Sequence, residues 1–290
     1  MENAASPPVT ATLLVSCRDR TGIVAALSDF VFKHNGNVLD ADQHAEADSD
    51  MFFMRLRWDL SGFTLDRKQV LEALAHIATR FDLQWEITFS DTRPKVVVFA
   101  SKIPHCLYDI LLANQLGELN GDLVAVVSNH DDLRSVAGHF GITFHHIPVL
   151  ADNKALAEQA QQALVDSLGA DLIVLARYMQ ILSPDFVNHR LGKIINIHHS
   201  FLPAFVGARP YHQAKARGVK LIGATAHYVT ADLDQGPIIE QDVARVTHRD
   251  DVPQLVQKGR ELERQVLTRA VKLHLERRVL ISDNRTIVFG

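Results

Sequence analysis

The sequence predicts an α/β protein in two parts, a small βαββαβ unit followed by a larger unit built on a mostly parallel sheet. Two observations carry this prediction. Strand patterns and amphipathic helix patterns follow one another in the order βαββαβ through the first ninety residues. After the polar stretch "SDTRP", the strands become apolar along their whole length and are separated by helices. With 290 residues, of which 47% are hydrophobic, the chain can bury a sizeable core in each part.

The first unit is assigned to residues 8–89. Its order of elements is the split βαβ pattern, and a ferredoxin-like fold is therefore expected. Gly36 is predicted to stop the first helix. The predicted strands are 10–17, 37–48, 50–60 and 83–89, and the predicted helices are 23–36 and 66–82. Residues 90–94 are polar, end in proline and are interpreted as a linker.

The second unit is assigned to residues 95–290 and is expected to be Rossmann-like. Its predicted strands are 95–101, 122–129, 143–149 and 171–178, with helices between them. Sheets of this kind bind ligands at the carboxyl ends of their strands. The stretches "ARYMQILS" (residues 176–183) and "INIHHSFLP" (residues 195–203) both lie where an apolar strand ends, so they are candidate site segments.

Composition excludes several classes of function. The net charge of −4 and the pI of about 6.4 leave no basic field for nucleic acid. No apolar run is long enough for a membrane helix, and the N-terminus does not resemble a signal peptide. Cys17 and Cys106 do not suggest a disulfide scaffold, and a cytoplasmic location is expected. The loop in "SKIPHCLYDILL" (residues 101–112) lacks glycine, so no phosphate cradle is expected there.

Three polar residues in the later segments form a candidate catalytic set. Asn196 can donate to a developing oxyanion, His198 can move protons near neutral pH, and Asp234 can orient the imidazole or a water molecule. This set suits attack of water on a carboxamide. Each residue taken alone could instead cap a turn. No metal site is expected, because the adjacent histidines at 145–146 and 198–199 point to opposite faces of a strand and no HExxH motif is present.

The motifs "NIHHSFLPAF", "LDQGPII" and "RYMQILS" together resemble the formyltetrahydrofolate-dependent formyltransferases, over residues 94–290. The resemblance implies that Asn196, His198 and Asp234 are the catalytic trio. Glycinamide ribonucleotide transformylases of this fold carry a glycine-rich phosphate loop and usually "HPS", whereas this chain has "HHS". The stretches "GARPYHQA" and "GRELERQVLTRAVKLHLERRVL" are similar to formyltetrahydrofolate deformylases, although Arg209 stands where that family usually has asparagine.

The resemblance implies hydrolysis of 10-formyltetrahydrofolate to tetrahydrofolate and formate, in one-carbon and purine metabolism, with no cofactor besides the folate substrate. It also implies that His199 and His227 tune or pack the site. Two alternatives stay open at this point, a formyltransferase with an unidentified amine acceptor and a non-enzymatic sensing module. The implied substrate-contacting residues are Arg177, Tyr178, Met179, Gln180, Leu182, Val229 and Thr230.

The stretch "VSCRDRTGIVAALSDFVFKHNGNVLD" (residues 15–40) resembles an ACT domain, the amino-acid-sensing module that such deformylases carry. The resemblance implies a homo-oligomer and an effector such as methionine or glycine. Asp19 and Thr21 could instead simply cap the following helix. The implied effector-binding residues are Asp19, Arg20, Thr21, Gly22 and Asn37.

Overall fold

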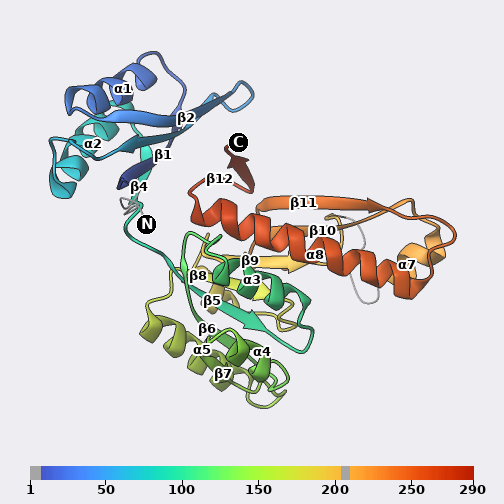
Figure 1. The fold of residues 1–290 in the computed structure, drawn as a ribbon. Coiled ribbons are helices and arrows are strands. Elements are labelled where there is room, and N and C mark those ends of the chain that lie inside the picture. Colours follow the sequence, from blue (N-terminus) through green and yellow to red (C-terminus); the bar gives the residue numbers. More distant parts are fainter. Residues whose placement is uncertain (1–7, 204–209) are drawn as a thin grey trace, which may run out of the picture. The chain divides into compact units, whose positions relative to one another are not determined.

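The computed structural model describes residues 8–203 and 210–290 (Figure 1). Its contacts divide the chain into two compact units, one of residues 1–93 with 287–290 and the other of residues 94–286. The boundary between residues 93 and 94 therefore lies inside the stretch 90–94, the predicted linker. The predicted α/β class, with a small antiparallel sheet and a larger, mostly parallel one, is confirmed.

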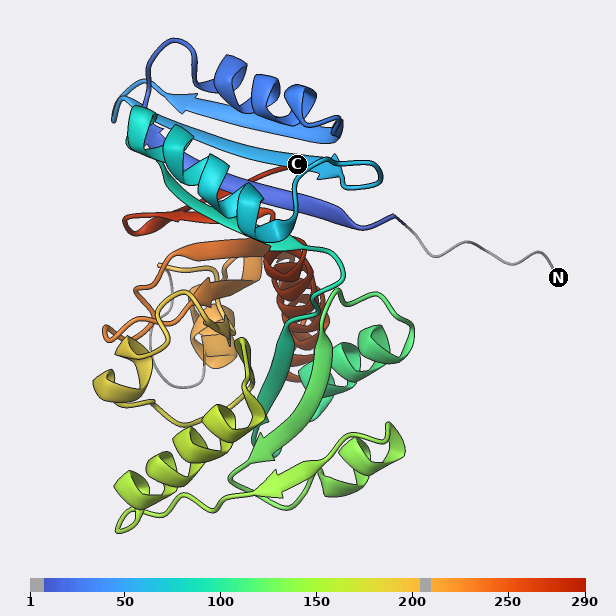
Figure 2. The ribbon, with the colours of Figure 1, turned by 90° about the vertical axis from the view of Figure 1, so that its left-hand side faces the viewer.

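The first unit is a four-stranded antiparallel sheet with the strand order β2-β3-β1-β4. Helices α1 and α2 (blue and cyan in Figure 2) share one apolar core with the sheet. The alternate residues 11, 13, 15 and 17 of β1 enter this core, as the period of two in a strand requires. The elements are β1 (Thr10–Arg18), α1 (Ile23–Lys33), β2 (Asn37–Glu46), β3 (Met51–Asp59), α2 (Arg67–Phe81) and β4 (Gln84–Phe89).

The end of α1 differs in detail from the prediction that Gly36 stops it. The helix ends at Lys33, and Asn35 is the residue in the left-handed region, with φ 60°. Gly36 is needed for space, because a Cβ there would lie 2.7 Å from Cγ1 of Val31. Glycine thus lets the chain pass close beneath the helix before β2 begins.

The second unit contains a seven-stranded sheet with the order β11-β10-β9-β8-β5-β6-β7. Strands β9, β8, β5, β6 and β7 run parallel, and β10 is antiparallel to both of its neighbours. A two-stranded sheet of β12 and β13 follows the last helix. The strands are β5 (Lys95–Ala100), β6 (Asp122–Ser128), β7 (Phe144–His146), β8 (Leu172–Ala176), β9 (Ile194–His198), β10 (Leu221–Tyr228), β11 (Ile238–Arg245), β12 (Val279–Ser282) and β13 (Arg285–Val288).

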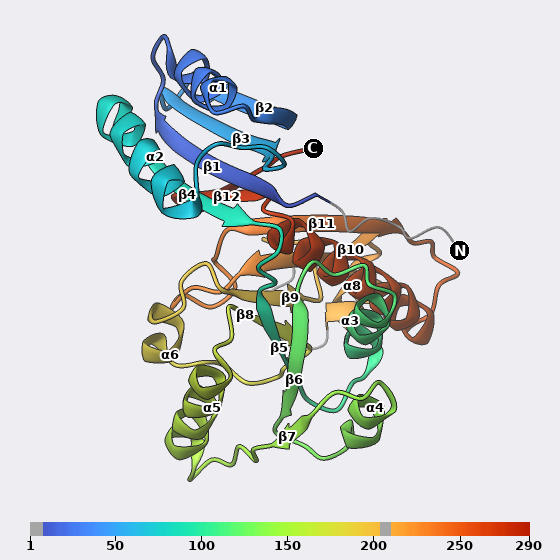
Figure 3. The same cartoon turned by 60° about the vertical axis from the view of Figure 1, so that its left-hand side comes forward.

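Helices cover both faces of this sheet (Figure 3). Val96, Val98 and Ala100 of β5 face a core shared with α3, α4 and α8, whereas Val97 and Phe99 face a second core shared with α5 and α6. This double burial explains why β5 is apolar at every position after its first residue. The helices are α3 (His105–Gln115), α4 (Arg134–His139), α5 (Lys154–Leu168), α6 (Pro184–Asn188), α7 (Pro210–Arg217) and α8 (Val252–Leu275).

Chain order reverses beside β5, because β6 lies on one side of it and the later strand β8 on the other. Such a switch point opens a crevice at the carboxyl ends of the strands. Ser101 follows β5, and its hydroxyl donates to Oδ1 of Asn129 (2.7 Å) and accepts from the backbone N–H of Met179 (3.1 Å). One hydroxyl therefore joins the ends of β5, β6 and β8. No helix within the described ranges is long and apolar enough to cross a membrane.

Candidate active site

Strand β9 carries two of the predicted catalytic residues. Asn196 and His198 are two positions apart, so their side chains leave the same face of the strand. Ile195 and Ile197, which alternate with them, enter the core shared with α3 and α8. The pleat of one buried strand thus places an amide and an imidazole side by side at the end of the sheet.

Asp234 reaches the same place from the turn between β10 and β11. The turn is closed by a hydrogen bond from the N–H of Tyr228 to the carbonyl of Pro237 (2.9 Å), and Asp234 adopts a left-handed φ of 56°. A Cβ on Gly236 would lie 1.8 Å from the carbonyl oxygen of Tyr228. Only glycine fits at that close approach, so the "DQGP" stretch is a structural requirement for presenting the carboxylate.

The carboxylate of Asp234 contacts both imidazoles of the site. Its Oδ2 lies 3.3 Å from Nδ1 of His198, and its Oδ1 lies 3.7 Å from Nε2 of His227. The interaction with His198, whose Nδ1 faces the carboxylate, holds the pKa of Asp234 far below its usual range. Asp234 is therefore an anion at any pH near neutrality. The structure thus brings together all three residues of the predicted trio.

The contact with Asp234 determines which nitrogen of His198 is available for chemistry. If Nδ1–H faces the carboxylate, Nε2 is the unprotonated acceptor. This Nε2 atom is buried and has no hydrogen-bond partner within residues 8–203 and 210–290. Buried polar atoms are rarely left unpaired. An unpaired acceptor at the end of a strand suits a general base that meets its proton only when substrate and water are present.

His227 orients Asn196. Nδ1 of His227 lies 2.9 Å from the carbonyl oxygen of Tyr228, so this nitrogen carries the donor hydrogen. Nε2 then accepts from Nδ2 of Asn196, at 3.2 Å. This bond uses one of the two amide hydrogens of Asn196 and leaves the other for a substrate oxygen. His227 thus holds the amide of Asn196 in one orientation, which is a way for a histidine to pack the site without taking part in the reaction.

His199 is a second imidazole, beside that of His198. The rings of His198 and His199 are stacked, with centroids 5.0 Å apart and planes at 27°. The prediction that these two side chains point to opposite faces of a strand is therefore wrong, because β9 ends at His198. Burial, the charge of Arg177 and the neighbouring His198 lower the pKa of His199 to about 4. His199 is therefore neutral at physiological pH, and it can pack against His198 without adding a competing positive charge.

The residues predicted to contact substrate separate into two groups. The side chain of Tyr178 faces the core beside Phe99, where its hydroxyl accepts from Gln161 and its pKa is raised to about 12 by burial. Tyr178 can therefore offer a ligand only its backbone. Met179 is 58% exposed at the end of β8, where an apolar ligand surface is expected.

The other predicted contacts lie on the same two segments. Leu182 and Val229 pack on one apolar cluster, and the N–H of Val229 donates to the carbonyl of Ile194 at the start of β9. Gln180 is half-buried, and the hydroxyl of Thr230 donates to the carbonyl of Asp232. The side chain of Arg177 turns instead toward Glu263.

Sequence reasoning missed a buried polar network beside the site. Glu263 of α8 is 2% exposed and contacts His105, Arg177 and Tyr211. The signal that could have found it is an acidic residue on the apolar stripe of α8, among Leu262, Val266 and Leu267. Ser101 and Asn129, at the ends of β5 and β6, were also missed.

Could the cluster of His105, Cys106 and Glu263 hold a metal ion? The ligand atoms of the three residues lie within 4.8 Å of one another. One feature argues against a metal. Nε of Arg177 is 3.4 Å from the same Glu263 oxygen that contacts His105, so a cationic side chain already balances the charge of this carboxylate.

The predicted effector residues gather only in part. In the first unit, a pocket of about 570 Å³ is lined by Asp19, Arg20 and Gly22, with Phe52 of β3. Thr21 and Asn37 do not line it. Gly22, with φ 96°, is the residue just before α1, and no side chain caps that helix, so Asp19 and Thr21 do not act as its caps. Arg209 lies outside the described residues.

These features define a class of protein, an α/β enzyme of the formyl transferase family. The family model for formyl transferases matches residues 94–271. A formyltetrahydrofolate deformylase from Synechocystis is 53% identical over 97% of this chain and 99% of its own. The corresponding Bacillus subtilis protein is 48% identical over 96% of this chain and 93% of its own. The chain belongs to the formyltetrahydrofolate deformylase family.

Solved structures agree with this assignment. The crystal structure of a formyltetrahydrofolate deformylase from Pseudomonas syringae superimposes with a TM-score of 0.96 at 47% identity, covering 99% of this chain and 96% of that one. A glycinamide ribonucleotide transformylase from Symbiobacterium toebii gives a TM-score of 0.65 at 29% identity. It covers 68% of this chain but 95% of its own. The deformylase match therefore extends over both units.

Proposed function

We propose that this protein hydrolyses 10-formyltetrahydrofolate to tetrahydrofolate and formate, and that Asn196, His198 and Asp234 carry out the reaction. The observation that carries the proposal is the convergence of these three side chains on one strand end. A neutral amide donor, an imidazole with an unpaired buried nitrogen and a permanently ionised carboxylate stand together there. The folate substrate follows from the family to which the chain belongs.

The first step is the attack of water on the formyl carbon. Asp234 accepts from Nδ1–H of His198, so Nε2 of His198 takes a proton from the water as its oxygen bonds to carbon. The His198 cation that forms is stabilised by the negative charge 3.3 Å away. Formyl oxygen becomes an oxyanion, which the free N–H of Asn196 stabilises.

The second step is the departure of the folate nitrogen. His198 returns its proton to that nitrogen, the carbon–nitrogen bond breaks, and formate is released. The water supplies one hydroxyl to the formyl group and one proton to the amine. The formic acid that results loses its proton to solvent and leaves as formate, so atoms and charges balance. The heterocycle would bind along residues 179–182 and the turn 229–234, where Met179 and Leu233 are both more than half exposed.

The experiment is an assay of purified protein with 10-formyltetrahydrofolate and no added amine. Formate and tetrahydrofolate should appear in equal amounts, and Asn196→Ala should lower kcat by about 10²–10³-fold, as the loss of one oxyanion donor does. Formyl release that occurs only when an amine acceptor is added would instead show a transferase. Ligand binding without turnover would favour a sensing module.

We propose separately that the first unit binds an amino acid in the pocket beside α1. An α-amino acid carries one ammonium and one carboxylate, and Asp19 and Arg20 offer a charge of the opposite sign to each. Phe52 adds an apolar wall for a side chain such as that of methionine. A homo-oligomer assembled through this unit would transmit the effect on activity.

Thermal melting and formate release with methionine and with glycine test this effector proposal. Either ligand should raise the Tm of the wild type, and Arg20→Ala should abolish the shift. Asp29→Asn is the control. Asp29 lies in the middle of α1 and does not line the pocket, and its ion pair with Lys33 is exposed, so this variant should keep the ligand-induced rise in Tm. An unchanged Tm and rate with both amino acids would exclude them as effectors.

A further inference from the structure

Glu263 is a buried carboxylate that the proposed chemistry does not use. It lies inside α8, 2% exposed, and its carboxylate contacts three residues from other segments. Oε2 contacts Nε2 of His105 (2.7 Å) and Nε of Arg177 (3.4 Å). Oε1 accepts from the hydroxyl of Tyr211 (3.0 Å).

The three partners come from the segments that frame the carboxyl edge of the sheet. His105 begins α3 just after the loop that follows β5, Arg177 is the first residue after β8, and Tyr211 lies in the first turn of α7. One side chain of α8 therefore ties three separate segments together. Such a contact fixes their positions with respect to one another.

Space for this network is built into the helix. Gly259 lies one turn before Glu263 on the same face of α8, and a Cβ there would lie 1.8 Å from the hydroxyl oxygen of Tyr211. Glycine inside a helix costs about 1 kcal/mol relative to alanine. Glycine at position 259 leaves the space that the Tyr211 side chain occupies beside Glu263, although it lowers the stability of the helix. The contact between Tyr211 and Glu263 therefore depends on this residue.

Arg177 shows the consequence of the contact. It adopts a left-handed φ of 60°, which is uncommon for a residue other than glycine. Directly after it, Tyr178 turns into the core beside Phe99, and the N–H of Met179 binds Ser101. The chain reverses its side-chain direction at Arg177, and in this conformation the Arg177 side chain lies beside Glu263.

Stability alone is a poor reason for such a group. Burial of an ion pair costs about as much desolvation energy as its attraction returns, and apolar replacements are often equally stable. Burial raises the pKa of Glu263, but the hydrogen bond from His105 and the charge of Arg177 outweigh it and lower the pKa. The carboxylate therefore stays charged, as an anchor for Arg177 requires.

We propose that Glu263 is a positioning residue, which acts through Arg177 to fix residues 178–182 as the binding surface for the substrate's heterocycle. It does not touch the reacting atoms. This inference rests on the proposed function, because that function assigns the heterocycle to this segment. The inference adds Glu263 of α8 to the residues on which the conformation of the binding segment 178–182 depends.

The test is a double-mutant cycle with Glu263→Gln, Arg177→Met and the double variant. Equilibrium binding of tetrahydrofolate is measured together with kcat and KM for formate release. Glu263→Gln should raise Kd and KM by about tenfold, within the range for residues that share one network, and change kcat by less than threefold. The double variant should bind no more weakly than Arg177→Met alone.

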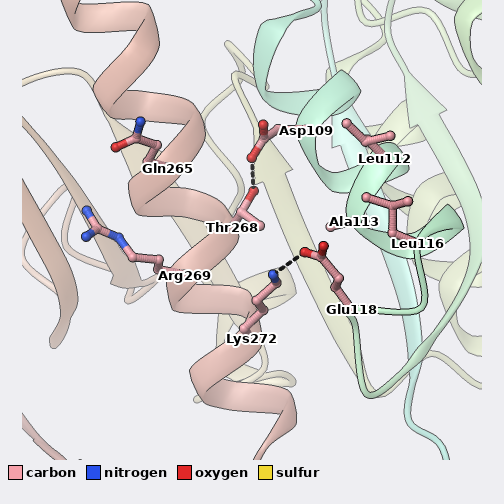
Figure 4. A pocket seen from close by; sticks show the side chains of 9 residues that line it. All are labelled: Asp109, Leu112, Ala113, Leu116, Glu118, Gln265, Thr268, Arg269 and Lys272. Carbon is pink, nitrogen blue, oxygen red and sulfur yellow. Dashed lines mark hydrogen bonds and ion pairs between the residues drawn. The ribbon is translucent and has the colours of Figure 1, made fainter.

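Thr268→Ala is the matched control. Thr268 is also on α8 and also ties this helix to α3, because its hydroxyl donates to Asp109 (2.5 Å). Figure 4 shows this contact beside the ion pair of Lys272 with Glu118. These residues line a pocket of about 400 Å³, and no member of the catalytic trio lines it. The control should lower Tm slightly and leave Kd and KM at the wild-type values.

Two results would overturn the proposal. The first is folded Glu263→Gln protein with unchanged Kd and KM, and the second is an additive loss in the double variant. If Glu263→Gln does not fold, Tyr211→Phe removes only the hydroxyl from Oε1 and should raise Kd about threefold; an unchanged Kd would then refute the idea. If wild-type protein binds tetrahydrofolate but releases no formate, the hydrolase function fails while the Kd cycle still decides the role of Glu263.

Discussion

The replacement Asp234→Asn isolates the role of one negative charge in the proposed reaction. The amide is nearly the same size as the carboxylate, so the turn between β10 and β11 should keep its shape. Two things change at His198. Its Nδ1 loses a permanently ionised partner, and the new NH2 group can donate to Nδ1 and so move the ring hydrogen to Nε2, the wrong tautomer for a base.

The expected magnitude follows from the distance. Two unit charges 3.3 Å apart attract by about 5 kcal/mol at an effective dielectric constant of about 20, and this attraction exists only once His198 has taken a proton. Part of it is offset by the hydrogen bond that asparagine can still make. We therefore expect kcat to fall by about 10³-fold, or about 4 kcal/mol, within the range of general acid–base catalysis.

The assay is formate release at saturating 10-formyltetrahydrofolate, with tetrahydrofolate binding and Tm measured on the same sample. Asp152→Asn is the control, because it removes the same charge from an exposed turn before α5, outside the proposed binding segments, and it should retain wild-type kcat. A value of kcat for Asp234→Asn within tenfold of the wild type, in protein with unchanged Kd, would refute the assigned role of the carboxylate.

Two further predictions concern stability. Burial lowers the folded-state pKa of His199 to about 4 and that of His274 to about 3, so below pH 6.5 the unfolded chain binds more protons and stability falls. Between pH 7 and pH 5 each histidine should cost about 2 kcal/mol, and urea unfolding of His274→Gln should show about half of the combined loss; a pH-independent midpoint would contradict this. Gly236→Ala should destabilise the protein by about 1–3 kcal/mol and reduce kcat, because its Cβ would collide with the Tyr228 carbonyl and displace the turn; wild-type Tm and kcat would show that the turn adapts freely.

Much of the fold could be predicted because its signals are local. β5 is apolar at every position after Lys95, which only a strand buried on both faces requires, and α2 begins at an Asp66 capping box, as the end of a polar loop suggests. The details that failed depend on contacts made at a distance. Gly36 looked like a helix stop, but its absent side chain makes room for Val31.

For the candidate site, the sequence by itself determined the residue types and their strand-end positions. Asn196 and His198 had to share a face because strands have a period of two, and Asp234 stood out as the acid before a Gly-Pro turn. Tertiary structure alone decided the distances, the contact of His227 with both Asn196 and Asp234, and the inward direction of Tyr178.

Glu263 is the clearest example of a residue whose contacts only the tertiary structure determines. In the sequence it is one of two acidic residues on a helix with five Lys and Arg residues, and its partners at 105, 177 and 211 are up to 158 positions away. Periodicity reports which face of an element is buried, but it carries no information on which buried groups meet. That pairing arises only when α8 packs against α3, α7 and the end of β8, and it is there that a carboxylate becomes an anchor.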